Sequence, residues 1–172
     1  MTMDMEGLER VYITARLDDE SRLVRLRDKV YDEVGGQRYY TKVEPHITVV
    51  PPFYFNKDRI DVVRELIEDS QIAGKAVEFN ELSVWESIDD PQYVMMDVEV
   101  DMRERQFELV DNIRERDGEY MKSPVPPHMT LFKSNDMWDN APAYLKSSIS
   151  DCFGNYRDVE DTQISEVEVV VT

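Results

Sequence analysis

One short pattern occurs twice in this chain, and its spacing constrains the fold more than any other feature. The pattern is Pro-His-x-Thr followed by two apolar residues, at 45–50 and again at 127–132. His46 and His128 are the only histidines and lie 82 positions apart (128 − 46), as do the predicted strand starts Val11 and Tyr93 (93 − 11). Because the two halves stay in register from the first strand to the histidine, we predict an internal repeat.

Hydrophobic periodicity predicts the same order of elements in both halves: strand, helix, strand, helix, strand. The predicted ranges are 11–17, 20–34, 45–50, 58–68 and 77–85 in the first half, and 93–100, 102–116, 127–132, 143–152 and 164–171 in the second. We therefore expect a single domain over residues 1–172 with an α+β, bilobal, duplicated fold. Its two lobes, approximately 11–85 and 93–171, are expected to be related by a pseudo-twofold axis around a central cleft. Chance similarity between two runs of alternating elements is the alternative.

Each histidine strand is expected to place its histidine and its threonine on the same face. Residues two apart on a strand point the same way, so His46 points with Thr48, and His128 points with Thr130. A single histidine on a strand is more often structural. Two histidines at equivalent places in a repeat favour one shared site.

Two imidazoles and two hydroxyls suit the cleavage of a phosphodiester by general acid–base catalysis. A neutral histidine can take a proton from the attacking water or hydroxyl, and a protonated one can give a proton to the departing ribose oxygen. Thr48 and Thr130 would donate hydrogen bonds to the non-bridging phosphate oxygens, where negative charge builds up. The sequence does not assign which of His46 and His128 is the acid and which is the base.

At these residues the chain resembles the two-histidine phosphoesterase superfamily, which contains the 2′-5′ RNA ligase-like proteins and the RNA 2′,3′-cyclic phosphodiesterases. The resemblance implies that His46 and His128 are catalytic, that Thr48 and Thr130 bind phosphate, and that no metal or nucleotide cofactor is needed. It implies hydrolysis of 2′,3′-cyclic phosphates at RNA ends or on nucleotides. Whether the chain also joins 2′,5′ linkages stays open.

Further site residues are suggested near the two motifs. Some members of the superfamily have a phosphate-contacting basic residue shortly after the second motif, and Lys133 occupies such a place; a solvated lysine at a strand end is the alternative. Arg38, Tyr40 and Lys42 precede the first motif and could line the cleft, although loop composition explains them equally well.

Three other residues are candidates on their position alone. Tyr12 and Arg16 lie on the first predicted strand, on the face opposite to its apolar residues, and could reach the same cleft. Phe53 follows the first motif and could stack on a base, but a place in the core explains it better.

The charge of the chain limits its partners and suggests its environment. Asp and Glu total 37 against 20 Lys and Arg, which gives a net charge of −17. This balance argues against tight binding of a long nucleic acid, which needs a basic surface. RNA ends, cyclic nucleotides or other small phosphate compounds are therefore the expected partners. Acidity spread along the whole chain also predicts adaptation to concentrated salt, as in a haloarchaeon.

The remaining expectations concern cellular context and competing functions. A single cysteine, Cys152, no apparent secretory signal and no membrane span fit a cytoplasmic monomer. Two other functions stay open: a module that binds cyclic or terminal phosphates without turnover, and a phosphodiesterase of a non-RNA cyclic phosphate metabolite. Intact histidines and threonines in both motifs favour an enzyme over a binding module.

Overall fold

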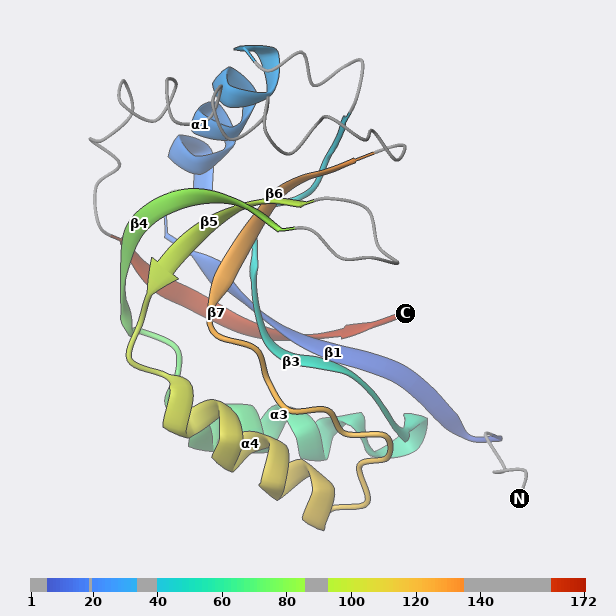
Figure 1. The fold of residues 1–172 in the computed structure, drawn as a ribbon. Helices are drawn as coiled ribbons and strands as arrows, with labels where there is room; N and C mark the ends of the chain where they lie inside the picture. The colour runs from blue at the N-terminus through green and yellow to red at the C-terminus, as the bar shows by residue number, and fades with distance from the viewer. Residues whose placement is uncertain (1–5, 19, 34–39, 86–92, 135–161) are drawn as a thin grey trace.

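The strands of this protein form one antiparallel sheet that closes on itself (Figure 1). The computed structural model describes residues 6–18, 20–33, 40–85, 93–134 and 162–172. Its elements are β1 (Leu8–Leu17), α1 (Glu20–Glu33), β2 (Tyr40–Lys42), β3 (Ile47–Asn56), the 3-10 turn η1 (Lys57–Arg59), α3 (Ile60–Ser70), β4 (Ala76–Trp85), β5 (Tyr93–Glu99), α4 (Arg103–Glu115), β6 (His128–Ser134) and β7 (Thr162–Val171).

The strand order is β2-β6-β3-β1-β7-β4-β5, and β5 pairs in addition with β6. The strands from β6 to β5 therefore make a closed, barrel-like ring, and β2 extends from the end of β6. Two joints of this ring are short: β3 pairs with β6 at Ile47 and Met129, and β4 pairs with β7 through residues 76–77 and 162–163. The predicted α+β class is confirmed.

The two predicted lobes exchange strands in this sheet. β4, the last strand of the first half, pairs with β5, and β7, the last strand of the second half, pairs with β1. Neither 11–85 nor 93–171 is thus a self-contained unit, because each half completes its sheet with a strand from the other. The duplication itself stays a prediction. The predicted helix at 143–152 lies outside the described residues.

The helices cover the sheet on the side away from the motif side chains. α3 and α4 lie next to each other along the β3 and β7 part of the sheet, and α1 lies by β6 (Figure 1). Their apolar stripes reach the core through the buried residues Leu23, Leu26, Val30, Ile60, Val63, Ile67, Leu109, Val110 and Ile113. The middle residues of the two motifs, Ile47 and Met129, belong to the same core and are fully buried. Among the described residues, none of the helices combines the length and the apolar character needed to cross a membrane.

The first histidine strand is longer than its sequence predicts. It was expected to end at Val50, yet β3 continues through Pro51 and Pro52 to Asn56. The β1–β3 register shifts between Val11 and Ile13, opposite the two prolines. Proline lacks the N–H that a regular ladder needs, so an irregularity in the pairing is where a strand can accept it. β2 was also not predicted, because three residues carry too little periodicity.

Candidate active site

Both histidine rings are held by the same kind of hydrogen bond. Nδ1 of His46 donates to the backbone carbonyl of Glu44 (2.9 Å), and Nδ1 of His128 donates to that of Pro126 (2.9 Å). A carbonyl oxygen can only accept, so Nδ1 carries a hydrogen in both rings. Nε2 is therefore the nitrogen through which either ring would exchange a proton with a substrate.

The two histidine strands meet where β3 pairs with β6, at Ile47 and Met129. Both of these side chains are fully buried in the core. Since neighbouring residues on a strand point to opposite faces, the residues on either side of each of them point away from the core.

Extending the antiparallel register by one residue in each direction sets His46 opposite Thr130 and Thr48 opposite His128. Side chains directly opposite in such a pair have Cβ atoms about 4.5–5.5 Å apart, and diagonal neighbours lie about 7–8 Å apart. All four side chains are partly exposed. They therefore surround one spot on the sheet, close enough together to contact a single phosphate group.

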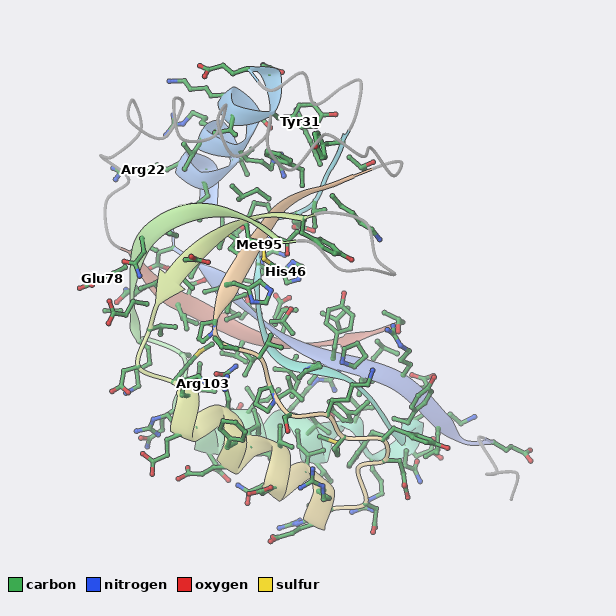
Figure 2. The ribbon with its side chains drawn as sticks, viewed as in Figure 1. Arg22, Tyr31, His46, Glu78, Met95 and Arg103 are labelled. Carbon is green, nitrogen blue, oxygen red and sulfur yellow. The ribbon has the colours of Figure 1, made fainter. Side chains whose placement is uncertain are left out.

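The registers of the outer strands extend this arrangement into two rows that cross the sheet on the same face. The first row runs from β5 to β7 through Asp97, His128, Thr48, Thr14 and Glu168, and the second through Met95, Thr130, His46, Arg16 and Glu166. Figure 2 shows His46 and Met95 together in the middle of the molecule, in agreement with the second row. We call this set of ten residues the site face.

Five residues of the site face were not singled out from the sequence, Glu166 and Glu168 at its β7 end and three that lie next to the motif residues. Thr14 pairs with Thr48, Asp97 pairs with His128, and the nearly buried Met95 pairs with Thr130. The period-two pattern of their strands shows which face each residue occupies. It does not show which strands become neighbours or in what register, and that information makes these residues part of the site.

Arg16 lies on the site face as expected, but its guanidinium is occupied by two carboxylates. Nε and Nη2 donate to the two carboxylate oxygens of Glu20 (2.6 and 2.8 Å), and Nη2 also donates to Oε1 of Glu44 (2.7 Å). Hydrogen bonds from Arg16 lower the pKa of Glu20, and the same bonds raise the pKa of the Arg16 guanidinium. Arg16 and Glu20 therefore both stay charged at neutral pH.

Lys133 lies beside the site face, on the same side of the sheet, because of an irregularity in β6. Strict alternation from His128 and Thr130 would turn Lys133 to the other side. The β5–β6 register shifts between Val94 and Met95, and this shift sets Lys133 opposite Tyr93. Its Nζ lies 5.8 Å from the centre of the Tyr93 ring. The exposed Lys133 is thus a cation next to the motif residues, and Tyr93 beside it was not predicted from the sequence.

Tyr12 lies two residues before Thr14 on β1, on the same face, and is opposite Val170 of β7. Its side chain is partly exposed. It therefore borders the site face two residues from the row that contains Thr48. Arg38, another candidate from the sequence, lies outside the described residues.

The structure places three other candidates away from the site. Tyr40 is buried against Phe132 (ring centres 5.7 Å apart), and burial raises the pKa of its hydroxyl to about 12. Lys42 pairs with Asp28 of α1 (3.1 Å), so the suggestion that Tyr40 and Lys42 line the site is wrong. Phe53 is fully buried, which confirms its predicted place in the core.

The β7 end of the site face is acidic. Burial, followed by the negative charge of its neighbour Glu166, raises the pKa of Glu168. Within the described part of the chain, no group of three or more His, Cys, Asp or Glu side chains is arranged to hold a metal ion. The polar groups at the centre of the face are the two imidazoles and the threonine hydroxyls.

Comparison with known proteins assigns the family. A family model described as the 2′-5′ RNA ligase superfamily matches residues 13–171, which is nearly the whole chain. The chain therefore belongs to the 2′-5′ RNA ligase superfamily, within the two-histidine phosphoesterases. A sequence search of curated proteins finds no match.

Solved structures share the fold at low sequence identity. The structure of Kluyveromyces marxianus Usb1 with uridine monophosphate has a TM-score of 0.59 at 15% identity, with 96% of this chain and 94% of that chain covered. The MHV ns2 PDE domain has a TM-score of 0.57 at 14% identity, with 95% and 99% covered. The likeness extends over nearly all of each chain and confirms the mixed α and β architecture.

Proposed function

We propose that this chain is a phosphoesterase that opens 2′,3′-cyclic phosphates at RNA ends or on nucleotides, with His46 and His128 as a general acid–base pair. The observation that carries the proposal is the β3–β6 register, which gathers His46, Thr48, His128 and Thr130 around one spot. Family membership and the two neighbours, of which one binds uridine monophosphate and the other is a PDE domain, support the same reaction class.

In the proposed reaction, one histidine takes a proton from water as the water oxygen attacks phosphorus. The other histidine gives a proton to the ribose oxygen as its bond to phosphorus breaks. The product is a ribose phosphomonoester with one free hydroxyl, and proton exchange with solvent restores both rings. When the 5′-hydroxyl of a second ribose attacks in place of water and the 3′-oxygen leaves, the same steps form a 2′,5′ linkage.

Thr48 and Thr130 would donate hydrogen bonds to the non-bridging oxygens, where charge accumulates in the transition state. Lys133 would neutralise part of the phosphate charge from the β5 side of the face. The mechanism needs no metal ion, because the two imidazoles perform both proton transfers. The acidic β7 end favours substrates with few phosphates, such as cyclic nucleotides and RNA ends, over a long nucleic acid.

The test is hydrolysis of 2′,3′-cyclic nucleotides and 2′,5′-linked dinucleotides in molar KCl, with EDTA present. We expect His46→Ala and His128→Ala each to lower kcat by about 10²–10⁴-fold while the ligand still binds, since each removes one proton transfer. Lys57→Ala, an exposed change on η1, is the matched control and should keep wild-type rates.

Two outcomes would contradict the proposal. Wild-type protein that binds these compounds without turnover would be a binding module. Turnover that survives in both histidine variants would remove the acid–base pair from the mechanism. If only a non-RNA cyclic phosphate were turned over, the proposed acid–base mechanism would stand and the proposed substrate would be wrong.

A further inference from the structure

The guanidinium of Arg16 points to a role other than phosphate binding. Glu20 occupies it with a bidentate contact and Glu44 adds a third hydrogen bond, so the trio carries one net negative charge. A phosphate would have to displace a bidentate carboxylate, which is among the strongest partners of an arginine. Arg16 and Glu20 are only 26% and 29% exposed, so solvent competes weakly for these bonds.

We propose that Arg16 is a positioning residue for His46, acting through Glu44; this rests on the proposed function of the site. Glu44 contacts Arg16 through its side chain and His46 through its backbone. Its side chain accepts a hydrogen bond from Arg16 (2.7 Å), and its backbone carbonyl accepts one from Nδ1 of His46 (2.9 Å). Holding the Glu44 side chain therefore holds the peptide group that orients the imidazole.

The residues on both sides of Glu44, Val43 and Pro45, are held by other contacts. The conformation of Glu44 therefore depends most on its own ion pair. Nη1 of Arg27 donates to the carbonyl of Val43 (2.7 Å), and the Val43 N–H donates to the carbonyl of Leu131 (3.2 Å). Pro45 is buried and has its φ fixed by its ring. Between these anchors, the side chain of Glu44 is 70% exposed and has Arg16 as its partner.

The second histidine bonds a carbonyl whose own residue has no ionisable side chain. His128 also bonds a carbonyl two residues upstream, but that carbonyl belongs to Pro126, which is followed by Pro127. Further upstream, Arg103 donates to the carbonyl of Pro124 (3.1 Å). Two consecutive prolines stiffen this loop by themselves. Loss of Arg16 should thus disturb His46 and leave His128 unchanged, which makes the second ring an internal control.

The kinetic test compares Arg16→Gln with Arg64→Gln in the full chain. Arg64 makes an exposed ion pair with Asp61 on α3 (2.6 Å), so its variant is a matched loss of one charge. We expect Arg16→Gln to lower kcat about 10–100-fold, the cost of a small misplacement of a reacting group, with little change in KM. Arg16→Lys should restore part of kcat because it keeps a cation beside Glu44. Arg64→Gln should leave both constants unchanged.

The structural test uses nitrogen NMR of the two imidazoles and does not depend on activity. In the neutral wild-type rings we expect hydrogen on Nδ1. In Arg16→Gln, and in Glu44→Ala should the first variant fail to fold, His46 should become a mixture of tautomers while His128 keeps its form. Unchanged His46 signals, or equal changes at both histidines, would overturn the proposal. A change at His46 alone in a protein without phosphoesterase activity would support positioning by Arg16 and refute the proposed function.

Discussion

Replacing Gln106 by leucine tests how the second half of the chain supports the first histidine strand. Gln106 lies on α4 with no exposed surface, and its Nε2 donates to the carbonyl of Val49 on β3 (3.0 Å). Val49 sits at a shift in the β1–β3 register, between Val50, which pairs with Ile13, and Thr48, which pairs with Thr14. The side-chain amide therefore bonds a buried carbonyl at the point where the ladder is irregular.

The expected cost follows from these contacts. Leucine is close to glutamine in size, so the substitution opens little cavity, and the loss of hydrogen bonds dominates. Besides the bond to Val49, the variant loses the weaker one that Oε1 accepts from Nη1 of the partly exposed Arg103 (3.3 Å). Leaving a buried carbonyl without this donor costs about 1–3 kcal/mol. For a chain of this length, about 2–4 °C of Tm is lost per kcal/mol, so Tm should fall by roughly 2–12 °C.

Urea unfolding at equilibrium measures this cost directly. We expect Gln106→Leu to lower the midpoint while the slope stays the same, because the surface exposed on unfolding hardly changes. Glu108→Leu, at an exposed position of the same helix, is the control and should stay within about 0.5 kcal/mol of wild type. A Gln106→Leu protein as stable as wild type would refute the inference that α4 stabilises β3 through this bond.

Two further predictions concern charge. Burial and the charge of Glu166 raise the pKa of Glu168, so the folded protein disfavours its ionised form. Glu168→Gln should therefore raise the free energy of unfolding at pH 7. The gain should vanish as pH falls below the ordinary glutamate pKa of 4.5, where the carboxyl is protonated in both the folded and the unfolded protein. A gain that does not depend on pH, or an equal gain in the exposed Glu108→Gln, would contradict this reasoning. With a net charge of −17, the free energy of unfolding should also rise with KCl toward molar concentration, and equal stability at low salt would remove the prediction of salt adaptation.

The sequence was sufficient to predict most elements of the fold, because periodicity reports which residues face the core. β1, α1, α3, α4 and β5 lie within a few residues of their predicted ranges. The exchange of β4 and β7 between the halves could not be read in this way. Strand neighbours are chosen by long-range pairing, and a periodic segment looks the same whichever strand it joins.

The same distinction between local pattern and long-range pairing applies to the site. The faces of His46, Thr48, His128 and Thr130 follow from alternation within each strand, and the structure places them as expected. Lys133 reaches this face only through a register shift, and Asp97 joins it only through pairing with β6. Arg16 was expected on the correct face, but the partners that fix its role, Glu20 and Glu44, come from a helix and a loop.

The proline that precedes each histidine has a physical reason that the bare motif does not reveal. A residue before proline favours extended conformations, and proline fixes its own φ, so the peptide two positions before the histidine is restricted. In the first half, the ion pair between Arg16 and Glu44 adds to this restriction. That peptide supplies the carbonyl that Nδ1 bonds, through Glu44 in one half and Pro126 in the other. Two loops with different neighbours thus present the same acceptor at the same distance. The repeat of Pro-His-x-Thr therefore supplies the functional groups in each half and restricts the orientation of each ring. A chain that kept the histidine but lost the proline would keep the functional group and lose this restriction.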